Sequence, residues 1–155
     1  MPKAKPVSAI AVLEEDHEYV KKAYREFEKM DHEDLEAVQA LVKNVCAALE
    51  VHTRIEEEIF YPPLRKALGD DDMMNEAEIE HDSAKTLIRQ LKRMKPSNQK
   101  YIAAFTVLCE YVLHHVKEEE DEMFPKAQRA GLNLKALGAK LMQRKISLAR
   151  RARSR

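Results

Sequence analysis

The chain has 155 residues, and its three glycines, lack of tryptophan and 35% charged residues favour one helical domain over a β-sheet protein. It has no apolar run long enough to span a membrane, no convincing signal peptide and only two cysteines, so we expect a cytoplasmic protein without a disulfide scaffold. The formal net charge of zero hides an asymmetry. Residues 132–155 contain eight Lys and Arg and no acid, so the preceding residues carry a formal charge of −8.

Apolar residues at three- and four-residue spacing predict four long helices and a closing fifth helix. Asp31 and Asp34 should cap the second helix and Asn133 the fifth, while Pro62 and Pro125 should stop or bend the second and fourth. The expected helices cover about residues 8–30, 34–62, 72–95, 98–125 and 133–150, with a short connection over 63–71.

The second pair of predicted helices repeats the first. A shift of 64 residues places His17 on His81, and a shift of 63 residues relates three further pairs. These pairs are His52 with His115, Glu56 with Glu119, and Pro62 with Pro125. Two similar αα-hairpins predict an all-α, up-down antiparallel four-helix bundle with a C-terminal fifth helix.

Six polar residues stand in the apolar stripes where core residues are expected. His17 lies between Leu13 and Val20, and Glu56 follows His52 by one helical turn on the same face. A single inward histidine is usually a hydrogen-bonded core residue, but two buried carboxylates each cost about several kcal/mol without a partner. The candidate metal ligands are His17, His52, Glu56, His81, His115 and Glu119.

The donor set indicates which metal to expect. Imidazole and carboxylate without thiolate favour iron, manganese or zinc over copper(I). Six ligands are too many for one tetrahedral zinc ion and suit two ions bridged by both carboxylates. Each ion would keep an open coordination position. Two redox-active ions of this kind point to two Fe ions with an oxo or hydroxo bridge and to oxygen chemistry.

These residues resemble the hemerythrin family, specifically its HHE cation-binding branch. The resemblance is carried by HTRIEEEIFYP at 52–62, HVKEEEDEMFP at 115–125, His17, His81 in EIEHD, and the ending LKALGAKLMQRKISL, and it covers about residues 8–150. It implies a non-haem di-iron protein. The ligands that it implies are His17 and His52 for one iron and His81 and His115 for the other, with Glu56 and Glu119 as bridges.

One position departs from the oxygen-carrying members, which have a second histidine four residues after the one in the third helix. Here that residue is Lys85, so the iron at His81 should have fewer protein ligands or should bind water, Glu118 or Glu120 in place of the missing histidine. The resemblance implies binding of or reaction with O2, H2O2 or NO in oxidative or nitrosative stress, with peroxide decomposition favoured. An O2 or iron binding, storage or sensing protein without turnover, and an iron donor for damaged iron–sulfur centres, remain alternatives.

A rival site would use the same helices. Glu14 with His17 and Glu78 with His81 match the Glu-x-x-His pattern of ferritin-like di-iron proteins. This reading takes Glu14 and Glu78 off the apolar stripe and leaves the histidines of the second and fourth helices unexplained.

The basic C-terminal segment has three interpretations. Most simply, the lysines and arginines face water while the apolar residues Leu137, Leu141, Ile146 and Leu148 pack on the bundle. Binding to an acidic partner or self-association is second, and nucleic-acid binding is third, because charge without stacking aromatics gives only non-specific attraction. We expect residues 1–150 to form the bundle domain and residues 151–155 to be a disordered basic tail.

Overall fold

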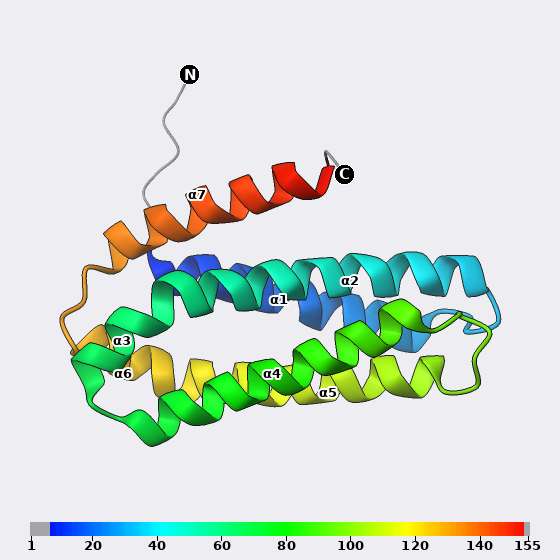
Figure 1. Ribbon diagram of the computed structural model, residues 1–155, viewed down its shortest axis with the longest axis horizontal. Coiled ribbons are helices and arrows are strands. Elements are labelled where there is room, and N and C mark those ends of the chain that lie inside the picture. The colour runs from blue at the N-terminus through cyan, green and yellow to red at the C-terminus, as the bar shows by residue number, and fades with distance from the viewer. Residues whose placement is uncertain (1–6, 154–155) are drawn as a thin grey trace.

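The computed structural model describes residues 7–153, and the regular elements within this range are all helical, which confirms the predicted all-α class (Figure 1). No helix in the described part of the chain is long and apolar enough to cross a membrane. The elements are α1 (Ala9–Lys29), α2 (Leu35–Ile55), the π-helical turn η1 (Glu56–Phe60), α3 (Tyr61–Leu68), α4 (Asp71–Arg93), α5 (Tyr101–Glu118), the π-helical turn η2 (Glu119–Met123), α6 (Phe124–Arg129) and α7 (Leu134–Arg153).

Side-chain caps start four of the long helices. The capping oxygens belong to Ser8, Asp34, Asp70 and Asn133, and each accepts a hydrogen bond from a backbone N–H two or three residues further on. These bonds satisfy amide groups that have no partner within the first helical turn. Asp34 caps α2 as predicted, whereas Asp31 accepts a hydrogen bond from the N–H of Glu33 in the preceding turn.

The helices α1, α2, α4 and α5 form a bundle, and α7 lies along one side of it (Figure 1). α1 contacts α2 and α5, and α4 contacts the same two helices, so the four helices close into a ring. The main contacts of α7 are with α1, α2 and η1. The fifth helix therefore covers the first hairpin rather than the second.

Both candidate bridging glutamates begin a π-helical turn. η1 and η2 each end two residues before a proline, Pro62 or Pro125. A proline has no N–H, and its ring clashes with the carbonyl four residues earlier, so the α-helical hydrogen-bond pattern cannot continue unchanged. Each predicted bend is thus a widened turn, a feature frequent at functional sites. The expected short connection is wrong over its first part, because α3 forms there.

A polar layer divides the apolar core into two clusters. One cluster lies between the four bundle helices and includes Phe27 and Phe105. The other joins the start of α1 to α3, α6 and α7 and includes Leu13, Phe60 and Leu141. The buried histidines and glutamates lie between these clusters, so apolar packing holds the polar layer from both sides.

Close packing against α1 fixes the position of α7. A Cβ atom on Gly138 would lie 1.9 Å from the carbonyl oxygen of Val7 and 2.9 Å from the backbone nitrogen of Ala9, so only glycine allows this approach. Leu141 and Leu148 are buried, as the sequence predicts, but the prediction is wrong for Ile146, which lies on the outer face of α7 and is 47% exposed. α7 continues to Arg153, where a disordered tail was expected, and residues 154–155 lie outside the described residues.

Candidate metal centre

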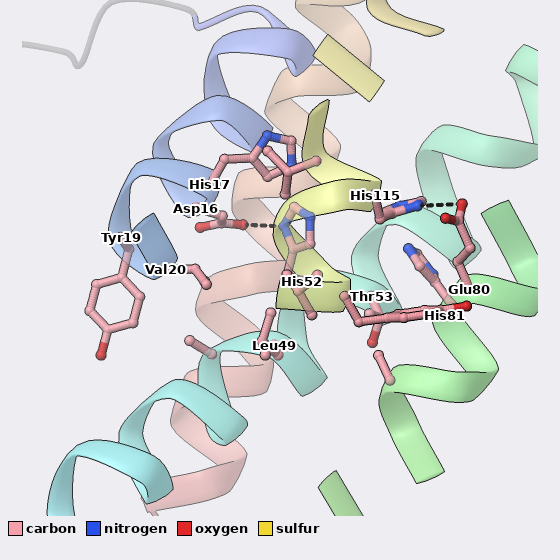
Figure 2. Close-up of a pocket in the computed structure, with 15 residues that line it drawn as sticks. Asp16, His17, Tyr19, Val20, Leu49, His52, Thr53, Glu80, His81 and His115 are labelled. Atoms are coloured by element: carbon pink, nitrogen blue, oxygen red, sulfur yellow. Dashed lines mark hydrogen bonds and ion pairs between the residues drawn. The ribbon is translucent and has the colours of Figure 1, made fainter. Parts of the chain in front are cut away.

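The structure brings the six predicted residues into one buried layer of the bundle, where Figure 2 shows the four histidines facing one another. α1, α2, α4 and α5 each contribute one histidine, and η1 and η2 contribute the glutamates. All six side chains are buried, with Glu56 and Glu119 at 0% exposure. The set comprises His17, His52, Glu56, His81, His115 and Glu119.

The six side chains form two groups of three. The nitrogen and oxygen atoms of each group lie within 4.8 Å of one another, as the ligands of one ion must. Each carboxylate also reaches the opposite group: Glu56 Oε1 lies 3.0 Å from His52 Nε2 and 3.3 Å from His81 Nε2. Glu119 lies 3.2 Å from His17 Nε2 and 3.5 Å from His115 Nε2. Each carboxylate therefore lies between histidines of both groups.

Several of these buried atoms have no hydrogen bond of acceptable geometry, although they lie close together. They are His17 Nε2, His52 Nε2, both carboxylate oxygens of Glu56 and Glu119 Oε1. Buried polar atoms without partners are rare and costly, and they need a compensating ion or water. Divalent cations that accept nitrogen and oxygen ligands fit this donor set.

Each histidine turns its other ring nitrogen outward to a carboxylate. His52 Nδ1 lies 2.9 Å from Asp16 and His115 Nδ1 lies 2.9 Å from Glu80 (Figure 2). The corresponding partners are Glu120 for His17 and Glu57 for His81, both at 3.1 Å. An Nδ1–H that donates to a carboxylate leaves Nε2 free to bind metal and makes it more basic.

Lysines hold three of these outer carboxylates. Lys21 contacts Glu120 at 3.1 Å, Lys85 contacts Glu57 at 2.6 Å, and Lys145 of α7 contacts Asp16. Lys85 therefore acts on His81 through Glu57. Of the two acids that the sequence suggested for the open position, Glu120 instead lies outside the histidine layer, bound to His17 Nδ1.

Without metal, the buried carboxylates keep protons on two histidines. Burial lowers the pKa of His52, but the charge of Glu56 and the hydrogen bond to Asp16 raise it to about 10. Burial likewise lowers the pKa of His115, while Glu119 and Glu80 raise it to about 11. Burial raises the pKa of Glu119, but His115 and its hydrogen bonds hold it well below the ordinary value. A bound cation must displace these protons.

Tyr61 is a further functional candidate, outside the six predicted ligands. Its hydroxyl lies 3.1 Å from His81 Nε2 and 3.2 Å from His115 Nε2, and it donates a hydrogen bond to Glu119 Oε2 at 2.7 Å. The hydroxyl oxygen therefore lies within the His81 group, beside the Nε2 atoms of both of its histidines. The repeat contained a signal, since the 63-residue shift pairs Tyr61 with Phe124, and Phe124 stacks on His17.

The rival ferritin-like pair lies outside the polar layer. Glu14 and Glu78 are exposed, and Glu78 forms an ion pair with Arg65 at 2.9 Å. His114 is also exposed, and its Nε2 lies 3.0 Å from Glu118 Oε1. Burial raises the pKa of Glu118, and the negative charge of Glu80 raises it further.

A small cavity adjoins the histidine layer on its apolar side. Its volume is about 30 Å³, and its walls include Val20, Leu49, Ala84 and Val112 beside the four histidines. A cavity needs roughly 10–15 Å³ of such volume to hold one water molecule, so the space suits a molecule of two or a few atoms.

A helical bundle with a buried layer of histidines and carboxylates defines a class of metal-binding proteins. Residues 8–127 match the family model of the Hemerythrin HHE cation binding domain, and the chain belongs to this family. The match confirms the predicted resemblance and the binding of a cation. α7 lies beyond the matched residues, although the sequence resemblance extended to about residue 150.

Two known proteins are similar to this chain. A crystal structure of a Hemerythrin HHE cation binding domain-containing protein from Mycobacterium kansasii is 26% identical, with a TM-score of 0.78 over 92% of this chain and 87% of that chain. A DNA nickase from Nostoc sp. strain PCC 7120 is 28% identical over 73% of this chain. The chain spans only 31% of the nickase.

Proposed function

We propose that the chain binds two iron ions and uses them to react with O2, H2O2 or NO, with decomposition of H2O2 as the favoured reaction. The buried atoms without hydrogen bonds carry the metal part of this proposal, because cations satisfy all of them at once. The proposed ligands are His17, His52 and Glu119 around one ion and His81, His115 and Glu56 around the other, with both glutamates bridging.

The small cavity supports a small molecule as the substrate. Its apolar walls leave room for O2, H2O2 or NO beside the histidines and exclude larger reductants. Peroxide decomposition converts two H2O2 into O2 and two H2O, so each half-reaction moves two electrons and two protons. Iron bound in this layer supplies the redox equivalents.

The protein's own groups orient the ligands of the ions. The outer carboxylates fix the orientation of each imidazole through Nδ1. Tyr61 donates a hydrogen bond of 2.7 Å to Glu119 Oε2, which holds this carboxylate in position within the buried layer. The apolar clusters above and below the layer pack against it and hold its side chains in place.

Anaerobic iron loading followed by metal analysis and O2-evolution kinetics with H2O2 tests the proposal. We expect two iron ions per chain and turnover that disappears in Glu119→Ala and His81→Ala. Binding of no more than one ion contradicts the metal centre. A stable, reversible oxygenated spectrum without turnover identifies a carrier or sensor instead, and rapid loss of iron to an acceptor protein identifies an iron donor.

A DNA-nicking assay on the same iron-loaded protein serves as a control, because one similar protein is a DNA nickase. The similarity covers less than a third of that relative, and no feature of the metal layer favours a nucleic-acid substrate. We therefore expect iron-loaded protein to leave supercoiled plasmid intact when peroxide is removed.

A further inference from the structure

The second hairpin has an acidic cavity that leads inward from its surface. The cavity has a volume of about 60 Å³ and lies between α4, the end of α5 and η2. His115 and Glu119 of the buried layer line it together with more peripheral glutamates. The peripheral glutamates are Glu76, Glu80, Glu118 and Glu122.

Three of the four peripheral glutamates have apolar counterparts in the first hairpin, and the fourth, Glu80, corresponds to Asp16. The two shifts of the repeat pair Glu76, Glu118 and Glu122 with the apolar residues Val12, Ile55 and Ile59. Val12 and Ile55 are buried in the core cluster that includes Leu141 of α7. α7 thus covers this side of the first hairpin, whereas the second hairpin presents carboxylates at the equivalent place.

The inner end of the cavity meets a group that needs a cation. Glu119 is fully buried, and its Oε1 has no hydrogen bond. Since Glu119 lines the same cavity as the peripheral glutamates, an ion that enters among them reaches a bridging carboxylate of the buried layer.

The outer end has the donors of a separate binding site. One ligand atom each from Glu80, His114 and Glu118 lies within 4.8 Å of the other two. His114 Nε2 is 3.0 Å from Glu118 Oε1, and 67% of the His114 side chain is exposed. Two carboxylates and an imidazole suit a divalent first-row metal ion, and the exposure allows the ion to exchange with solvent.

We propose that Glu80, His114 and Glu118 form a third, exchangeable cation site, and that the acidic cavity behind it is the route by which ferrous iron reaches the buried layer. This role rests on the iron binding proposed for that layer. The iron remains ferrous along the route, and protons held by the buried histidines leave as the ion replaces them. A cleft lined by one sign of charge concentrates counter-ions and accelerates their association.

A metal titration tests the outer site. Co²⁺ added to chelator-treated protein should bind as two tight equivalents and one weaker equivalent, measured by calorimetry. The double variant His114→Ala with Glu118→Gln should lose the weak equivalent and keep the two tight ones. Glu36→Gln removes a charge from an exposed position at the far end of α2, so it should keep all three.

Loading kinetics test the route. Glu118→Gln with Glu122→Gln should slow anaerobic Fe²⁺ uptake by about tenfold at low salt, and the difference should shrink as ionic strength rises. The final iron content should match that of the unaltered protein and of Glu36→Gln.

Two results overturn the inference, and a third separates it from the proposed function. The outer site is wrong if no third equivalent binds, and the route is wrong if uptake in the double glutamine variant is unchanged. If the unaltered protein takes up no iron in the buried layer, the proposed function itself fails, whereas two bound ions with unchanged kinetics reject only the inference.

Discussion

The two hairpins of the bundle hold equivalent histidine groups in different surroundings. Asp16 and Glu80 are related by the 64-residue shift, and each binds the Nδ1 of a histidine. The same shift relates Lys21 to Lys85, and each lysine holds an outer carboxylate. The approximate twofold symmetry of the sequence therefore extends beyond the predicted ligands to the residues that orient them.

The two hairpins differ in the residues that control access to the buried histidine layer. Tyr61 places a hydroxyl beside the His81 group, whereas its counterpart Phe124 stacks on His17. α7 packs on the first hairpin and supplies Lys145 to Asp16, whereas Glu80 of the second hairpin faces an acidic cavity. The two hairpins thus share the arrangement of histidines and outer carboxylates but differ in the residues that surround it.

The largest effect is expected from pH in the metal-free protein, and it should involve both hairpins. The folded-state pKa values of His52 and His115, about 10 and about 11, lie above the unfolded value of 6.5. Their stabilisation, on the order of a few kcal/mol, is therefore fully present below about pH 6.5 and is lost as the pH rises through 10 and 11.

Thermal denaturation of chelator-treated protein between pH 7 and 11 measures this loss. Metal binding needs neutral imidazoles, so metal affinity should rise with pH over the same range and loading should release protons. A midpoint temperature that is constant up to pH 11 in the metal-free protein would contradict the raised pKa values.

Displacement of α7 should affect only the first hairpin. Gly138→Ala forces a Cβ against the backbone of Val7, so we expect a loss of about 1–3 kcal/mol in the free energy of unfolding. Hydrogen exchange should increase in α7 and around Asp16 but not in α5. Ala139→Ser, at an exposed neighbouring position, is the matched control, and equal exchange in both hairpins would show that α7 stabilises the whole bundle.

Removal of the Tyr61 hydroxyl tests whether it distinguishes the His81 group from the His17 group. Tyr61→Phe should keep two bound ions but lower metal affinity or peroxide turnover by roughly tenfold, because a ligating or proton-donating oxygen is lost from the His81 group. Phe124→Tyr adds a hydroxyl beside His17 and is the matched variant. If Tyr61→Phe changes neither kcat nor metal affinity, the hydroxyl has only a packing role.

The smallest effects are expected from the lysines. Lys21→Met and Lys85→Met should weaken metal binding equally and by less than about fivefold, since partly exposed ion pairs contribute about 0–1 kcal/mol. Competition with a chelator of known affinity measures the change. A much larger effect of Lys85→Met would show that this lysine does more than its symmetry partner.

Local periodicity explains why the sequence predicted so much of the fold. The spacing of Leu13, His17 and Val20 places all three on one helical face, and the resulting helix bounds agree with α1 within a residue or two. The 63-residue shift of the repeat pairs His52 with His115, and the structure places both histidines in the same buried layer. Their role as metal ligands remains a prediction.

Contacts between helices decided the rest. Asp16 and His52 are 36 residues apart in the sequence, and Lys145 and Asp16 are 129 residues apart. Neither hydrogen bond therefore follows from the periodicity of one helix. The π-helical turns before Pro62 and Pro125 set the direction of the glutamates, and the position of Tyr61 depends on that turn. The sequence by itself determined which residues face inward, because this needs only the helical repeat, whereas helix packing decided which of them meet.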